Sequence, residues 1–109
     1  MNIHNKGTLI EFWLKHGDSK KELLLWYNDV MSKSWTKPND VKKDYISASI
    51  IKNNRVVFNI KRNDYRLIVE FNYFKGWGFI KFIGTHAEYD RINAETVNKF
   101  PGKRKNNKI

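Results

Sequence analysis

Residues 55–71, which read RVVFNIKRNDYRLIVEF, decide the fold. Apolar and more polar side chains alternate over 55–60, and this two-residue period predicts a strand. A polar turn follows over 61–64, and the same alternation predicts a second strand over 65–71. A tight reversal over 74–77 then leads into a third predicted strand over 78–84. The three segments together predict an antiparallel meander.

Helices are expected before this meander. The pairs Thr8 with Glu11 and Ser19 with Glu22 have the three-residue spacing of a capping box, in which a hydroxyl and a carboxylate satisfy exposed backbone N–H groups. Each pair is followed by apolar residues at helical spacing, so each predicts an amphipathic helix. Pro38 suits the first position of a third, brief helix.

A last helix is predicted directly after the third strand. Thr85 and Glu88 form a further capping pair, with His86 in the first turn. Tyr89 and Asp90 lie three and four residues after His86, so the three side chains share one helical face. We therefore expect a cluster of polar side chains at this end of the sheet.

The order of elements predicts an α+β fold, because helices precede a run of strands. The N-terminal helices are expected to pack on one face of a small antiparallel sheet, with a short C-terminal helix, and to leave the other face free for a ligand. One domain is expected over residues 1–98. Residues 99–109 carry several basic side chains and no acid, and are expected to form a flexible basic tail.

Composition narrows the class of partner. The chain has 109 residues, no cysteine and a formal net charge of +10, and residues 52–109 hold 13 of the 21 basic but only 5 of the 11 acidic side chains. The lack of cysteine excludes a disulfide scaffold and a cysteine-ligated zinc site. No apolar run is long enough to span a membrane and no signal peptide is evident, so we expect a cytoplasmic protein with a polyanionic partner, nucleic acid before a membrane surface.

The sequence lacks the motifs of several catalytic classes. The three histidines have no metal-ligand spacing, the glycines form no phosphate-binding loop, and no serine nucleophile elbow is present. We therefore expect no metal and no cofactor. Metal-free chemistry on a phosphate remains, because the 2′-hydroxyl of RNA can serve as the nucleophile while protein groups move protons and neutralise the phosphate.

Candidate residues for this chemistry come from the last two strands and the last helix. The leading set is His86, Arg66 and Lys81, with Tyr89 beside His86. We expect Arg66 and Lys81 to point to the open face and the helix to overhang them. A structural interpretation stays open, in which Arg66 forms an ion pair with Glu70. Further basic residues are candidates for RNA binding: Lys61, Arg62, Arg55 and Arg91.

Three runs of residues resemble HigB-type toxins of bacterial type II toxin-antitoxin systems. They are RVVFNI at 55–60, NDYRLIV at 63–69 and FIGTHAEYD at 82–90, in the family's order and spacing. The resemblance covers most of residues 1–97. It implies a RelE-like microbial ribonuclease fold, cleavage of mRNA on the ribosome, growth arrest, and a cognate helix-turn-helix antitoxin similar to HigA.

The resemblance also assigns roles to individual residues. His86, Tyr89 and Arg66 fall on motif positions that suit catalysis or phosphate binding, and Lys61 falls on a frequent basic position. Supporting roles are implied for two acidic residues of the same motif, Glu88 and Asp90. The family often has glycine where Arg62 stands, so the resemblance gives Arg62 no role.

Two other classes of function stay open. The same basic sheet and its aromatic residues could hold single-stranded or ribosomal RNA without cutting it. The basic charge could also match an acidic protein. Catalysis that needs the planar guanidinium of Arg66 would not tolerate lysine, whereas binding through charge alone would.

Overall fold

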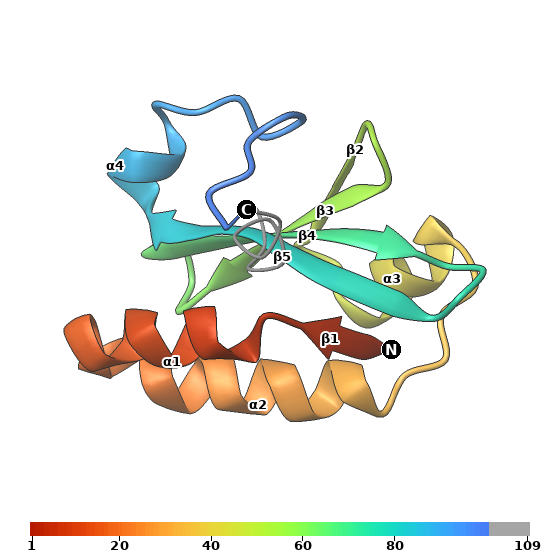
Figure 1. The fold of residues 1–109 in the computed structure, drawn as a ribbon, viewed down its shortest axis with the longest axis horizontal. Coiled ribbons are helices and arrows are strands. Elements are labelled where there is room, and N and C mark those ends of the chain that lie inside the picture. Colours follow the sequence, from red (N-terminus) through yellow and green to blue (C-terminus); the bar gives the residue numbers. More distant parts are fainter. Residues whose placement is uncertain (101–109) are drawn as a thin grey trace, which may run out of the picture.

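The computed structural model describes residues 1–100 (Figure 1). The elements in chain order are β1 (Asn2–His4), α1 (Lys6–Lys15), the 3-10 turn η1 (Gly17–Ser19), α2 (Lys20–Met31), α3 (Pro38–Asp44), β2 (Ser49–Ile51), β3 (Arg55–Ile60), β4 (Tyr65–Asn72), β5 (Trp77–Thr85) and α4 (His86–Tyr89). The expected α+β class is confirmed.

The strands form one mixed sheet in the order β1-β5-β4-β3-β2. The central strands β3, β4 and β5 form the predicted antiparallel meander, with register partners such as Asn59 with Arg66 and Arg66 with Gly84. The sheet is not purely antiparallel, because β1 pairs with β5 in parallel, and neither β1 nor β2 was predicted. The sheet therefore has two short edge strands, each of three residues.

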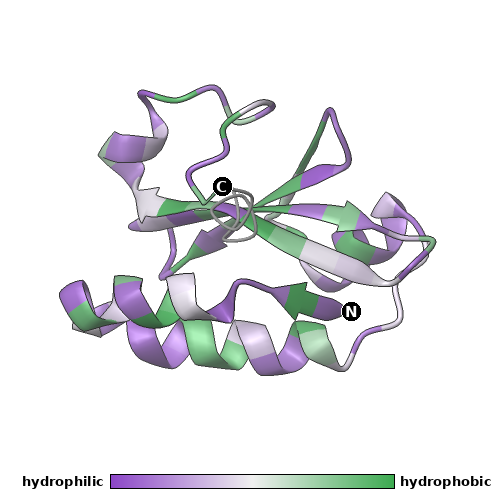
Figure 2. Ribbon diagram, in the orientation of Figure 1, coloured by the Kyte–Doolittle hydropathy of each residue, from purple (hydrophilic) through white to green (hydrophobic). Residues whose placement is uncertain are grey.

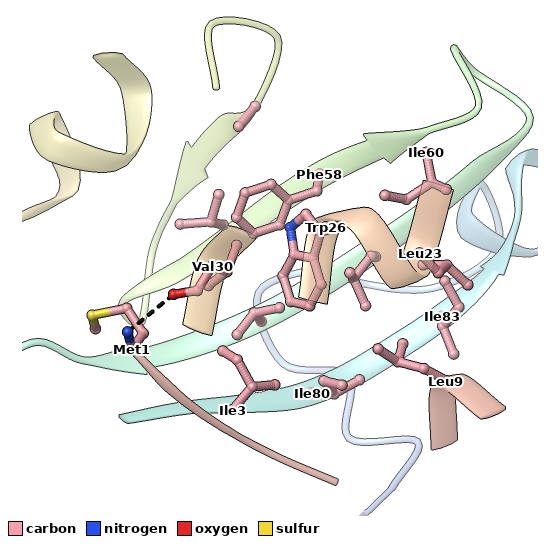
Figure 3. Close-up of a cluster of buried hydrophobic side chains, with 14 of the residues drawn as sticks. Met1, Ile3, Leu9, Leu23, Trp26, Val30, Phe58, Ile60, Ile80 and Ile83 are labelled. Carbon is pink, nitrogen blue, oxygen red and sulfur yellow. Dashed lines mark hydrogen bonds between the residues drawn. The ribbon is translucent and has the colours of Figure 1, made fainter. Parts of the chain in front are cut away.

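The main core lies between the sheet and helices α1 and α2, which run below it in Figure 1. Figure 3 shows Leu9 of α1 and Leu23 of α2 against Ile80 and Ile83 of β5. All four side chains are at most 1% exposed, and each such burial contributes about 1.5–3 kcal/mol. Figure 2 shows hydrophobic segments along the strands and on both α1 and α2, whereas α4 is largely hydrophilic.

The opposite face of the sheet, here called the second face, is partly covered. A smaller cluster of Val57, Ile68 and Phe82 is buried there under Tyr89 and under side chains of residues 92–97. We call residues 92–99 the strap, because they return across the second face after α4 (Figure 1). The backbone N–H of Lys99 donates to the Lys81 carbonyl at 2.9 Å. The expectation of a wholly free face is thus wrong for its middle part.

The predicted helix starts are partly right. Helix α1 begins at Lys6 with Asn5 as its N-cap, so the Thr8–Glu11 capping box is wrong; the Thr8 hydroxyl donates to the Asn5 carbonyl at 2.7 Å. Ser19 does stand at the N-cap of α2, but its hydroxyl donates to the His16 carbonyl and makes no cap bond. Pro38 opens α3 as predicted. Local spacing thus located the starts of α2 and α3, but the cap hydrogen bonds expected at Thr8 and Ser19 do not form.

The C-terminal boundary also differs from the prediction. Lys99 and Phe100 fall within the predicted flexible tail but are packed against the domain. The rest of the predicted tail, residues 101–109, lies outside the described residues. None of the helices within residues 1–100 has the length and apolar character needed to cross a membrane.

Candidate nucleic-acid site

The β3–β4 turn presents two cations from an unusual backbone conformation. Lys61 and Arg62 both have positive φ, 53° and 61°, which is uncommon for residues other than glycine. The backbone N–H of Lys61 donates to Glu22 at 2.7 Å and its ammonium lies 3.1 Å from Asp18, so the turn is fixed to the helical layer. Arg62 is exposed and makes no side-chain hydrogen bond or ion pair within residues 1–100. The turn thus holds the Arg62 guanidinium toward solvent at one end of the sheet.

A hydrogen-bond network under the turn keeps it in place. The Tyr65 hydroxyl and the Lys61 ammonium both donate to the carboxylate of Asp18. These bonds favour the ionised carboxylate and hold the pKa of Asp18 below its usual value. The bond to Asp18 raises the pKa of Tyr65 to about 12, because it requires the phenol to keep its proton. No local sequence pattern indicates this network, because it joins residues 47 positions apart.

Arg66 is the cation at the centre of the site. Its guanidinium carbon lies 5.4 Å from the centroid of the Tyr89 ring, a cation–π contact. One guanidinium nitrogen donates to the Asn63 carbonyl at 3.2 Å. No carboxylate pairs with Arg66 among the described residues, and Glu70 pairs instead with Arg55 at 3.0 Å. The structural interpretation of Arg66 as the partner of Glu70 is therefore wrong, and most of its five N–H donors are available to a ligand.

Helix α4 is fixed by the predicted capping box. The Thr85 hydroxyl accepts from the Glu88 N–H at 3.1 Å, and the Glu88 carboxylate accepts from the Thr85 N–H at 2.8 Å. The N–H of His86 donates to the Asp64 carbonyl at 3.0 Å, which joins α4 to the β3–β4 turn. Gly84 leaves room for this cap, because a Cβ there would lie 2.7 Å from Glu88 Oε1. Glu88 thus serves the helix start.

The exposed face of α4 carries the other predicted groups. His86 Nδ1 lies 3.1 Å from an oxygen of Asp90, and both side chains are about half exposed, at 49% and 59%. Tyr89 packs toward Phe82 with ring centroids 6.4 Å apart, which places its ring on the second face. Arg66, Tyr89 and α4 therefore meet at one end of this face, although no hydrogen bond joins Arg66 to His86 among the described residues.

Two predicted site residues, Arg55 and Lys81, lie away from the cluster around Arg66 and α4. Arg55 is only 6% exposed and donates to the carbonyls of Ala94 and Val97 at 3.0 and 2.6 Å as well as to Glu70. Its guanidinium holds the strap and is not presented to RNA, which corrects its expected role. Sequence alternation could not reveal this, since the strap residues are about 40 positions away.

Lys81 lies apart from Arg66. It is the extra residue of a β-bulge, because Ile80 and Phe82 face consecutive residues of β4, Val69 and Ile68. Its ammonium lies 5.9 Å from the centroid of the Phe79 ring, away from α4. The expected grouping of Lys81 with Arg66 is therefore not seen. Arg91, two residues after the end of α4, is exposed and lines a hollow with Phe82 and the strap.

Comparison with known proteins identifies the family. No curated protein matches the chain. Residues 19–92 match the model of the HigB_toxin family, described as the RelE-like toxic component of a toxin-antitoxin system. The match runs from the start of α2 through α4 and includes the β3–β4 turn, Arg66, His86 and Tyr89. The chain belongs to the HigB_toxin family of RelE-like toxic components of toxin-antitoxin systems.

Proposed function

We propose that this toxin is an endoribonuclease that cuts mRNA on the ribosome through attack of an RNA 2′-hydroxyl on the adjacent phosphate, without a metal ion. The observation that carries this proposal is that the Arg66 guanidinium keeps most of its donors unpaired next to α4. It has no carboxylate partner among the described residues and stacks on Tyr89 beside exposed His86. An arginine that keeps its donors free on a solvent-accessible face is suited to bind a phosphate.

Each group has a distinct proposed role. Arg66 donates to the non-bridging oxygens of the scissile phosphate and stabilises the negative charge that grows there during attack. His86 and Tyr89 are the candidates for moving the two protons, one from the 2′-hydroxyl and one to the departing 5′-oxygen. Asp90 orients the imidazole through its 3.1 Å contact with Nδ1. Because RNA supplies the nucleophile, none of these roles requires a metal ion.

Basic residues around this centre are proposed to bind the RNA backbone. Lys61 and Arg62 lie on the turn that α4 contacts, and Arg91 follows α4. Phosphate contacts of this kind give affinity that is independent of sequence and falls with salt. Membership in a toxin family implies a cognate antitoxin. We propose that the antitoxin is a helix-turn-helix protein and that the toxin acts in the cytoplasm.

Induced expression without an antitoxin tests this function. Growth should stop, and mapped 5′ ends of transcripts should show cuts inside translated codons. Arg66→Lys keeps the charge but loses the planar fork, so cleavage should fall about tenfold or more. Lys43→Gln, which removes an exposed charge from α3, is the control and should cleave as the wild type does. Growth arrest with intact full-length transcripts would refute the nuclease and favour an RNA-binding module that does not cut.

A further inference from the structure

We propose that a row of aromatic and basic side chains along β5 binds unpaired bases of RNA. The row, here called the β5 strip, consists of His4, Lys75, Trp77, Phe79 and Lys81. It lies outside the cluster around Arg66 and α4, and it extends the proposed ribonuclease function by giving the RNA a second contact.

The strip lies on the second face of the sheet. Gly78 and Ile80 alternate with Trp77 and Phe79 along β5. Gly78 and Ile80 face the main core. Ile80 is fully buried in that core, and a Cβ on Gly78 would meet Ile3 and Phe71 of the same core. Alternation along a strand therefore directs Trp77 and Phe79 to the opposite side. Both side chains are partly exposed there.

The three rings of the strip contact one another. Trp77 and Phe79 have centroids 5.9 Å apart at 90°, and the His4 ring stacks on Phe79 at 4.7 Å and 14°. Strand β1 positions His4, because its register places His4 directly beside Phe79. This packing fixes the rings in advance, so little side-chain entropy is lost when a base stacks on them.

Cations stand at both ends of the aromatic pair. The ammonium of Lys75 lies 4.8 Å from the Trp77 ring centroid, and that of Lys81 lies 5.9 Å from the Phe79 centroid. Neither ammonium makes an ion pair within residues 1–100. Aromatic faces that alternate with free cations are the pattern by which proteins hold single-stranded nucleic acid, with bases on the rings and phosphates on the charges.

A hollow of about 390 Å³ adjoins the strip, bounded by Phe79 and by the side of β4. Asn54, Asn72 and Glu70 also line it. Asparagine amides both donate and accept, so they can contact the edge of a base that stacks on Phe79. Glu70 is the one carboxylate in this lining, and its charge is balanced by Arg55 at 3.0 Å.

The strip is aligned with the proposed catalytic end. Strand β5 runs from Trp77 to Thr85, about 26 Å at the usual rise per residue, and α4 follows directly. The strap returns over the middle of the second face, and within residues 1–100 no helix covers the β4–β5 hairpin end of this face (Figure 1). To reach Trp77 on this side of the sheet, an extended RNA strand bound at Arg66 passes over the outer surface of the strap. An acidic protein would use the cations but would have no need of stacked rings.

The test is binding of a short 2′-O-methyl oligouridylate, which has little structure and lacks the 2′-hydroxyl needed for cleavage. Fluorescence anisotropy of the labelled oligonucleotide gives Kd for the full chain. Phe79→Leu and Trp77→Leu keep the net charge but remove a ring, so each should weaken binding about 5- to 100-fold. Phe79→Tyr keeps the ring and should bind as the wild type does. Lys75→Gln should reduce the slope of log Kd against log salt concentration by about one, as expected for the loss of one phosphate contact.

Trp13→Leu is the matched control. Trp13 is partly exposed and has the Lys20 ammonium 5.9 Å from its ring centroid, but it lies on α1 and packs against the main core on the other side of the sheet. Its variant should bind like the wild type. Equal affinity of Trp13→Leu and Trp77→Leu, with both variants folded by circular dichroism, would overturn the proposal. So would equally tight binding of polyglutamate with the same dependence on the rings, which would indicate an acidic protein partner.

The outcomes separate this inference from the ribonuclease. Transcript cleavage without oligouridylate binding would refute the strip and leave the nuclease intact. Binding that depends on the rings, in a chain that leaves transcripts uncut, would support the strip and refute the nuclease.

Discussion

Replacement of Arg55 by methionine should destabilise the protein strongly. Arg55 is 6% exposed, and methionine can fill the space of its apolar stem but cannot donate. The change removes bonds to the carbonyls of Ala94 and Val97 and to Glu70. Hydrogen bonds from a charged group contribute about 1.5–3 kcal/mol each. We give the Glu70 bond little weight, because that side chain is 39% exposed and can be hydrated.

The two carbonyl bonds at the lower end of this range sum to about 3 kcal/mol. For a domain of this size such a loss lowers Tm by roughly 10–15 °C. Thermal unfolding by circular dichroism measures the shift. The Lys99 amide, which joins the strap to the Lys81 carbonyl of β5, should also exchange its hydrogen faster than in the wild type.

Arg62→Met is the control for this prediction, because Arg62 is exposed and makes no side-chain bond within residues 1–100. Its Tm should stay near that of the wild type. Equal Tm values for Arg55→Met and Arg62→Met would show that the Arg55 bonds do not hold the strap, and the assigned role of this buried arginine would be wrong.

Three further predictions concern the supports of the site. Gly84→Ala should displace the Glu88 carboxylate from the Thr85 N–H, because the new Cβ would approach it to 2.7 Å; we expect weaker RNA cleavage, and a wild-type rate would contradict the packing. Thr85→Ala should cost about 1 kcal/mol through loss of the cap, measured by urea unfolding, whereas Thr85→Ser should cost little. Stability should depend on pH through Tyr65 and Asp18. The raised pKa of Tyr65 gives a contribution that is complete below about pH 10 and is lost as pH rises toward 12, and the lowered pKa of Asp18 gives one that is present above about pH 4 and is lost at lower pH. Tyr65→Phe should flatten the alkaline limb of Tm against pH and weaken the acid limb; an unchanged profile would contradict the network.

The meander and α4 could be predicted from sequence because their signals are local. The alternation in 55–71 requires only neighbouring residues, and the Thr85–Glu88 box forms within four residues. Strand β1 has no such signal. It has three residues and exists because it pairs with β5, whose partner positions are 75 residues away.

The same contrast between local signals and long-range contacts applies to the site. The meeting of Arg66 with α4 could be predicted, since strand direction and helix start are both local features. The partner of Glu70 could not be predicted, because it depends on whether the strap buries Arg55 or Arg66. Arg55 lies opposite Glu70 in the sheet register and is covered by the strap, whereas Arg66 lies beside α4. The bulge at Lys81, which turns that residue toward Phe79, likewise arises from pairing and not from a turn motif.

End-group analysis of cleaved RNA tests the proposed chemistry most directly. Purified toxin is added to ribosomes that carry a defined mRNA, and the products are compared for the wild type and Arg66→Ala. Attack by the 2′-hydroxyl predicts a 2′,3′-cyclic phosphate and a 5′-hydroxyl, no cut where the 2′-hydroxyl is replaced by hydrogen, and about 100-fold or more loss of rate in the variant. Products with 5′-phosphates, or cleavage next to a 2′-deoxynucleotide, would contradict the mechanism.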